Sequence, residues 1–569
     1  MGKRYLIVLD DMWDCMAWDD LKLSFPDVGN RSRIVVTTRL EEVGKQVKYH
    51  TDPYSLPFLP LDESCKLLRK KVFQKEDCPP ELQDVSQAVA EKCKGLPLVI
   101  VLVAGIIKKR KTEESWWNEV KNSLLSYLGE SEEYSLSTMQ LSYDNLPDCL
   151  KPCLLYLGMF PEDAIIPVSK LISLWIAEDF VQNIESGRLI EEAAEGYLMD
   201  LISSNLVMVS ERKYNGKVKY CQVHDVVLHF CLEKSREENF MLVVKGDYSQ
   251  LQPFQWNESR VSFSFSKELS KFASLGSKIR KPLHQHLRSL ITTNRAESYG
   301  WNPIRKVSEV RLLKVLDLSS CGVRVLSSVT FKPLIHLKYL TVSTKEFEFH
   351  PEPHLPNLET LIVEGLSKFI VLPAIFWKMK KLRHVEIGEA ELDLKWENNK
   401  EMFEESSKLE NLSILRRVVI HEGDRVAVLL QRCPNLQQLD IIFSGDEDSA
   451  EICLKFESLT QLQMLRLSLL MSTRIDSVIP FIAGLPNLEY LQLSMTVQCQ
   501  RQFRQSEEWC LGDITFHKLK FLKLVFLDIS RWDASDESFP LLETLVISWC
   551  DNLEEIPVSF ADIPTLKHI

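Results

Sequence analysis

The sequence lacks an export signal, a membrane-spanning run and paired cysteine motifs. The apolar stretch after its basic N-terminus ends at Asp10 and Asp11, too early for a signal peptide. The longest apolar run, residues 96–107, contains Pro97 and is much shorter than the roughly 20 residues that span a bilayer. None of the 14 cysteines lies in a CxxC pair or beside a histidine ligand, so reduced thiols are expected. These features predict a cytoplasmic protein without a transmembrane segment, and leave peripheral membrane or nuclear association open.

An excess of positive charge is also absent. The 569 residues carry a formal net charge of -12, whereas a protein that binds nucleic-acid backbones needs a basic face. No direct nucleic-acid partner is therefore expected, although a basic patch within one domain is not excluded by the total. The length exceeds what one hydrophobic core can organise and predicts three or four folded units.

A phosphate-binding loop of the form G-x-x-x-x-G-K-[ST] is absent as well. The Gly-Lys pairs that begin at Gly2, Gly44 and Gly216 lack the preceding glycine and the following hydroxyl residue. The backbone amides of such a loop cradle phosphates, and its lysine neutralises them. The sequence therefore predicts weak or lost nucleotide binding and no efficient hydrolysis, so the chain is not expected to be an enzyme.

The C-terminal half contains a repeat. Ten copies of the pattern L-x-x-L-x-L follow one another at intervals of 21 to 33 residues, which is typical of leucine-rich repeats. Each copy predicts a short strand, and stacked copies bury one continuous leucine core. The copies begin at Leu313, Leu337, Leu358, Leu382, Leu415, Leu436, Leu462, Leu488, Leu519 and Leu542. Partner specificity is expected in exposed positions between the leucines, such as Lys338, Tyr339, Glu359, Gln437 and Glu489.

The N-terminal half predicts an α/β domain followed by helices. Residues 5–9 and 33–38 are apolar and rich in β-branched side chains, and their spacing favours two parallel strands joined by a crossover. Residues 61–128 have a helical pattern. Residues 206–210 and 218–223 predict a hairpin across Asn-Gly that ends a helical domain, which suggests a winged helix.

Ordered motifs along the chain resemble those of a known family. Residues 6–13, 32–39 and 95–98 resemble the kinase-2 (Walker B), sensor and GLPL motifs of NB-ARC domains. Residues 141–147, 153–163 and 174–178 resemble the winged-helix signature of the coiled-coil class, and Val223-His224-Asp225 stands where that family has Met-His-Asp. The chain is identified as a member of the plant coiled-coil NB-LRR disease resistance proteins, N-terminally truncated, without the coiled coil and the phosphate-binding loop.

The resemblance implies a multidomain α/β fold. A remnant of a P-loop NTPase-like nucleotide-binding domain is expected over 1–55, a helical subdomain over 56–132 and a winged helix over 133–235. A polar bridge is expected over 236–300 and the leucine-rich-repeat solenoid over 301–569. Loss of a central strand would expose apolar surface and unpaired backbone on its neighbours, so residues 1–55 are expected to be poorly stable alone.

The resemblance also implies roles for five residues in a site for ADP or ATP with Mg²⁺. Asp10 would hold Mg²⁺ and Asp11 would polarise a water, unless the pair only caps the following helix. Arg39 would contact the γ-phosphate, although a surface cation is the alternative. Pro97 would lie beside the adenine, or would simply begin a helix. His224 would contact the β-phosphate of ADP, or would be a structural histidine.

The function implied by the resemblance is recognition of a pathogen effector or a guarded host protein through the repeats. Recognition would be coupled to ADP/ATP exchange and defence signalling, with intramolecular or homo-oligomeric contacts. The missing phosphate-binding loop favours an impaired switch, so a non-switching repeat adaptor or decoy is the main alternative. An active NTP hydrolase and a DNA-binding regulator are disfavoured by the missing loop and by the acidic charge, respectively.

Overall fold

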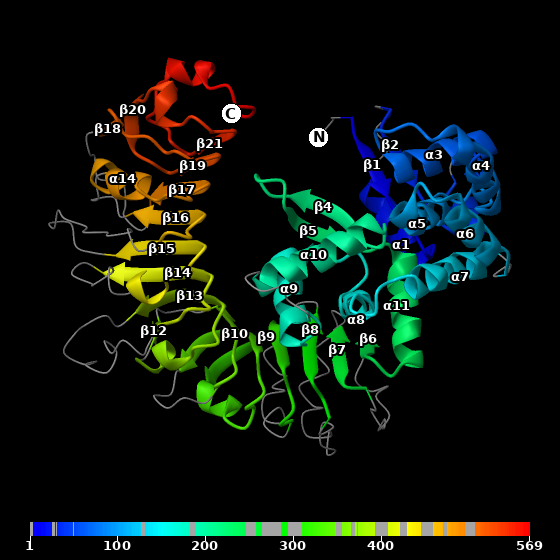
Figure 1. Ribbon diagram of the computed structural model, residues 1–569, viewed down its shortest axis with the longest axis horizontal. Coiled ribbons are helices and arrows are strands. Elements are labelled where there is room, and N and C mark those ends of the chain that lie inside the picture. The colour runs from blue at the N-terminus through cyan, green and yellow to red at the C-terminus, as the bar shows by residue number, and fades with distance from the viewer. Residues whose placement is uncertain are drawn as a thin grey trace. The chain divides into compact units, whose positions relative to one another are not determined.

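The computed structural model describes most of the chain, and Figure 1 shows it in ribbon form. The described residues form two compact units, 1–100 and 101–569. None of the helices described is long and apolar enough to cross a membrane. The description covers residues 4–25, 29, 31–48, 51–126, 131–182, 189–245, 258–264, 286–293, 310–348, 355–365, 370–372, 374–392, 408–421, 430–444, 459–469, 475–495 and 507–569.

The first unit begins with two parallel strands, β1 (Leu6–Leu9) and β2 (Arg33–Val36). Helix α1 (Met16–Leu21) lies between them in sequence, and α2 (Glu41–Val47) follows β2. The expected parallel pairing is confirmed, with Leu6 opposite Arg33 and Leu9 opposite Val36. One apolar side-chain set of this pair is largely exposed, since Leu6 is 67% and Val8 58% accessible.

The predicted helices of residues 61–128 are also confirmed. They are α3 (Leu61–Phe73), α4 (Gln83–Lys92), α5 (Pro97–Ile107) and α6 (Glu114–Ser126). Helix α5 is the longest apolar run of the sequence, and seven of its side chains are at most 3% exposed: Val99, Ile100, Leu102, Val103, Ala104, Ile106 and Ile107. The run is thus a buried helix of a globular fold.

The next part of the chain is helical and contains a small antiparallel sheet. Its helices are α7 (Ser131–Asp144), α8 (Lys151–Tyr156), α9 (Val168–Ala177), α10 (Ile190–Ser203) and α11 (Asp225–Glu237). Strand β5 (Val218–Gln222) pairs with β3 (Ile166–Pro167) and with β4 (Met208–Arg212). The predicted hairpin is confirmed, and Gly216 supplies the positive φ of 78° that its turn requires.

A long parallel sheet follows, in which successive repeats contribute neighbouring strands (Figure 1). All ten strands predicted from the leucine pattern are present. Their alternate leucines join one buried cluster, because successive side chains of a strand point to opposite faces. The ten strands are β9 (Val315–Ser327), β10 (Tyr339–Glu348), β11 (Thr360–Glu364), β13 (His384–Leu392), β14 (Ile414–His421), β15 (Gln438–Ser444), β16 (Met464–Leu469), β17 (Tyr490–Met495), β19 (Phe521–Val525) and β21 (Thr544–Ser548).

Four smaller elements accompany these strands. Strand β12 (Ile370–Leu372) pairs with β13, and β18 (Glu507–Cys510) pairs with β20 (Ile529–Asp533) in a separate two-stranded sheet. Helix α14 (Ile475–Ala483) lies between β16 and β17 in sequence. These elements lie in the segments that separate the leucine motifs.

The sheet begins earlier than the sequence suggested. Strands β6 (Leu242–Lys245), β7 (Arg260–Ser264) and β8 (Ser289–Thr293) extend it before β9, so the prediction of an irregular bridge over 236–300 is wrong for these segments. Val261 and Phe263 join the leucine cluster without matching the leucine pattern. Burial of such alternating residues, rather than leucine itself, defines these strands.

Candidate functional site

Polar residues meet where β1 and β2 end. The Thr37 amide donates to the Leu9 carbonyl at 3.0 Å, which continues the parallel ladder past both strands. The Thr37 hydroxyl donates to the Asp10 carboxylate and accepts from the Asp11 amide, the latter at 2.9 Å. Thr37 thus holds both aspartates at the edge where the two parallel strands end.

Asp11 and Arg39 form a two-point ion pair at this edge. The Arg39 Nε lies 3.2 Å from Oδ1 of Asp11, and an Nη atom donates to Oδ2 at 3.3 Å. Trp13 supports the pair, since its indole donates to Asp11 at 3.1 Å and the guanidinium lies 5.1 Å from its ring centre. The Arg39 and Asp11 side chains are 51% and 38% exposed, and such exposed pairs contribute about 0–1 kcal/mol. A phosphate group could therefore replace Asp11 as the partner of Arg39 at low cost.

The donor set at this edge fits part of a nucleotide site. The Asp10 carboxylate and the Thr37 hydroxyl are hard oxygen ligands of the kind that Mg²⁺ prefers. The guanidinium of Arg39 matches a phosphate in shape and charge. The sequence contains no glycine-rich loop to supply backbone amides to a phosphate. The edge therefore offers cation ligands and one phosphate contact.

Pro97 begins α5 and is exposed. Gly95 precedes it with a positive φ of 70°, and a Cβ atom there would lie 2.4 Å from the Leu59 carbonyl oxygen. Leu59 donates its amide to the Gly95 carbonyl at 2.9 Å. This close backbone approach explains why the motif needs glycine, and Pro97 suits a first helical turn. The adenine contact of Pro97 stays a prediction.

His224 caps the N-terminus of α11. Its Nδ1 accepts a hydrogen bond from the Val226 amide at 3.2 Å, so the proton of the neutral ring lies on Nε2. Nε2 is then the donor that a phosphate contact would require. His224 belongs to the unit 101–569, whereas Asp10, Asp11, Arg39 and Pro97 belong to the unit 1–100. The phosphate site that the resemblance assigns to all of them stays a prediction.

The end of α9 carries a buried ion pair that the sequence did not predict, although Glu178 closes the motif of residues 174–178. The Glu178 side chain is fully buried, and its carboxylate accepts from Arg260 Nε at 3.0 Å and from the Ser289 hydroxyl. The Arg260 guanidinium also lies 4.3 Å from the centre of the Phe240 ring. Arg260 belongs to β7 and Ser289 to β8, so this buried ion pair joins the helical part to the first strands of the repeat sheet.

Asp179 extends this junction on the surface. It has a positive φ of 62°, and its two carboxylate oxygens each lie 2.6 Å from a lysine, Lys314 or Lys338. Burial alone would raise the pKa of Asp179, but the hydrogen bonds and charges of the two lysines outweigh it and lower the pKa. Lys338, expected among the ligand-reading positions, is thus used within the chain. Tyr339, expected to be exposed, is 1% exposed, so that prediction is wrong.

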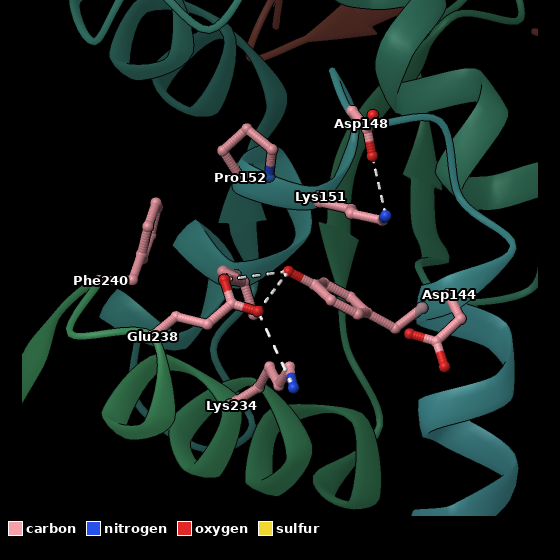
Figure 2. A pocket seen from close by; sticks show the side chains of 9 residues that line it. Asp144, Asp148, Lys151, Pro152, Lys234, Glu238 and Phe240 are labelled. Carbon is pink, nitrogen blue, oxygen red and sulfur yellow. Dashed lines mark hydrogen bonds and ion pairs between the residues drawn. The ribbon is translucent and has the colours of Figure 1, made fainter.

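A cavity of about 370 Å³ lies between α7, α8 and the end of α11 (Figure 2). The Tyr143 hydroxyl donates to Glu238 at 3.2 Å, and burial together with this carboxylate raises the pKa of Tyr143. Lys151 pairs with Asp148 at 2.8 Å, and Lys234 lies 3.9 Å from Glu238. Three carboxylates and two lysines line this cavity, and both lysines are paired with carboxylates, so no lysine is left to attract an anionic ligand.

Comparisons with known proteins agree with the motif order. Residues 1–78 match the model of the NB-ARC domain, and residues 159–231 match that of the disease resistance protein winged helix domain. Over its whole length the chain is 37% identical to the late blight resistance protein homolog R1B-16 and 36% identical to the late blight resistance protein R1-A, both of Solanum demissum. It spans 45% of the length of each. A leucine-rich-repeat protein of Leptospira interrogans with a solved structure is similar over 55% of this chain and 90% of that chain, with 15% identity and a TM-score of 0.30.

Proposed function

The chain belongs to the plant NB-LRR disease resistance proteins, and from this premise we propose that it serves as the sensing part of an innate immune receptor. In this proposal the repeats bind a pathogen effector or a guarded host protein in the cytoplasm. The winged helix then transmits the binding event towards defence signalling. Because the relatives are named for late blight resistance, the late blight pathogen is the first candidate source of an effector.

The buried ion pair between Glu178 and Arg260 carries this proposal. If β7 moved without Glu178, the ion pair would break and a buried charge would remain unpaired, which costs several kcal/mol. The winged helix must therefore follow β7 and β8. A receptor needs such a link to pass a change in the repeats on to its winged helix, whereas a simple binding module does not.

Nucleotide exchange is the second part of the proposal. Asp10 and Thr37 would hold Mg²⁺, and Arg39 would exchange its bond to Asp11 for a phosphate of ADP or ATP. Bound Mg²⁺ would neutralise phosphate charge, and the chain's own residues would orient the nucleotide. Because the sequence contains no phosphate-binding loop, we expect weak binding and no efficient hydrolysis, so the chain is not an enzyme in this proposal.

Expression of the full chain in leaves of a susceptible plant, followed by challenge with the late blight pathogen, tests the receptor function. We expect restricted pathogen growth with the wild-type chain and loss of that restriction with Glu178→Gln. Exposed Glu211, whose carboxylate pairs only with Lys219 in the described hairpin, provides the matched control Glu211→Gln. Equal restriction by wild type and Glu178→Gln would favour the alternative, a non-switching repeat adaptor or decoy.

A further inference from the structure

The tip of the β4–β5 hairpin lies against the repeat sheet through an aromatic cluster. The Tyr214 ring centre lies 5.2 Å from that of Tyr490 and 5.5 Å from that of Phe521. Tyr490 and Phe521 stack on each other at 4.8 Å with an angle of 6° between their planes. Three aromatic rings from distant parts of the chain thus form one contact, of the geometry that stabilises aromatic pairs.

Tyr490 and Phe521 stand on the face of the sheet opposite the leucine core. They are register partners that begin β17 and β19, and the next residues, Leu491 and Leu522, are fully buried in the core. Since side chains alternate along a strand, the two aromatics face away from that core. Tyr490 is nevertheless only 8% exposed, because the hairpin tip covers it. The pair is therefore an aromatic seat that is filled by Tyr214.

The surroundings of the seat suit the ring of Tyr214 but not the positive charge of the adjacent Lys213. Burial lowers the pKa of Lys213, Glu195 partly offsets this, and the cations Arg416 and Arg466 lower it further. Arg466 stands in β16 with its guanidinium 5.8 Å from the Tyr490 ring centre. Its Nε is buried and has no hydrogen-bond partner among the described residues. The hairpin thus brings a lysine to a place where the repeats offer cations and an unused donor.

The acidic groups near the seat do not offset the repulsion between Lys213 and the repeat cations Arg416 and Arg466. Glu489 is bonded to Lys520 at 3.0 Å, and Glu386 to Arg416 at 3.2 Å. Asp440 is the register partner of Arg466, but burial raises its pKa although Arg466 opposes the shift. A carboxylate beside the aromatic ring could therefore accept a hydrogen bond from the Arg466 Nε, which the ammonium of Lys213, itself a donor, cannot do.

We propose that the stacked pair Tyr490–Phe521, with Arg466 beside it, is a binding site for a protein loop that presents an aromatic side chain next to a carboxylate, and that Tyr214 occupies this site until such a loop replaces it. The proposal rests on the proposed function, in which the repeats bind a protein partner, and names the chemistry of that partner. The hairpin is a suitable placeholder because its tip is closed by backbone bonds from Lys213 to Lys217 at 2.7 Å and from Gly216 to Lys213 at 2.9 Å.

A cyclic peptide with the sequence of residues 208–222, carrying a fluorophore, tests the site by fluorescence anisotropy with the full chain. We expect the peptide to bind the variant Tyr214→Ala about tenfold more tightly than the wild type, because the variant leaves the seat open. A second peptide in which Lys213 is replaced by Glu should bind Tyr214→Ala a further two- to fivefold more tightly, roughly the gain from one added ion pair. Equal binding of the first peptide to wild type and Tyr214→Ala would overturn the proposal, as would weaker binding of the second peptide.

Two further variants separate the seat from general damage. Phe521→Ala in the Tyr214→Ala background should abolish peptide binding. Phe526→Ala in the same background should not, since Phe526 stacks on Trp549 at 5.9 Å and is 44% exposed. Equal loss with both variants would contradict the proposal. Tighter peptide binding to Tyr214→Ala without pathogen restriction in leaves would contradict the proposed receptor function but support the aromatic site. Pathogen restriction without tighter peptide binding would contradict the aromatic site but support the receptor function.

Discussion

Glu178 and Arg260, 82 residues apart in sequence, form a buried ion pair, with 0% of the Glu178 side chain and 9% of the Arg260 side chain exposed. Arg260 contributes Nε and Nη2, each 3.0 Å from one carboxylate oxygen, and Ser289 bonds the other oxygen. The Phe240 and Phe180 rings lie over the guanidinium at 4.3 and 5.1 Å. Such a pair seldom adds net stability over apolar packing, but it makes any separation of its partners costly. It therefore fixes how the winged helix joins the repeats.

Removal of one partner of this pair should be strongly destabilising. Arg260→Met leaves the Glu178 charge buried without a guanidinium, and we expect the free energy of unfolding of the unit 101–569 to fall by about 3–5 kcal/mol. The double variant Glu178→Gln/Arg260→Met should recover part of that loss, because no buried charge remains. Urea denaturation followed by tryptophan fluorescence measures both. A loss no larger than that of the exposed-pair control Glu211→Gln, about 0–1 kcal/mol, would show that the pair is hydrated in solution.

The leucine pattern predicted ten strands because each repeat buries the same residue type at the same spacing. The pattern failed at β7, where Val261 and Phe263 occupy the buried positions. The strand ends Asp10, Asp11 and Thr37 could be predicted to meet, since parallel strands end at a common edge. The ion pair from Asp11 to Arg39, and the one from Glu178 to Arg260, depend on side-chain packing that no local pattern encodes.

His224 should contribute to stability as a helix cap, independently of any phosphate contact. His224→Ala removes the acceptor of the Val226 amide, and we expect a loss of about 0.5–2 kcal/mol. His224→Asn supplies another capping acceptor and should retain most of the stability. If His224 also binds phosphate, His224→Asn should weaken ADP binding while the melting temperature stays near that of the wild type. Equal melting temperatures of His224→Ala and the wild type would contradict the capping role.

Nucleotide content is a direct measure of how complete the strand-edge site is. We expect well under one ADP per chain to be released when the purified protein is denatured, because the sequence contains no phosphate-binding loop. Addition of ADP with Mg²⁺ should raise the melting temperature only at high nucleotide concentration, and Arg39→Ala should reduce this shift. Stoichiometric ADP, detected by chromatography of the released material, would contradict the expectation of weak binding.

The acid stability of the repeats should depend on Glu386. Burial alone would raise its pKa, but the nearby His384, with Nε2 3.7 Å from the carboxylate, and Arg416, with a guanidinium nitrogen at 3.2 Å, outweigh burial and lower the pKa to about 2, from an ordinary value of 4.5. A lowered folded-state pKa stabilises the fold above pH 4.5, and this contribution is lost as the pH falls from 4.5 to about 2. Glu386→Gln should therefore be less stable than wild type at neutral pH, with the difference shrinking over that window. A difference that is constant with pH in urea titrations would rule out this ionisation as its source.

The strands β1 and β2, which precede Asp10 and Arg39, should be the part of the described sheets least protected from hydrogen exchange. Two paired strands are marginally stable on their own, and β1 and β2 leave Leu6, Val8 and Val35 between 47% and 67% exposed. Their amides should exchange with deuterium much faster than those of β15 and β16, which lie inside the repeat sheet with buried leucines. Slow exchange of β1 that becomes fast on dilution would mean that self-association covers these apolar side chains. Substitution of Leu6 and Val8 by Thr should then abolish the protection, because it removes the apolar surface that self-association would bury.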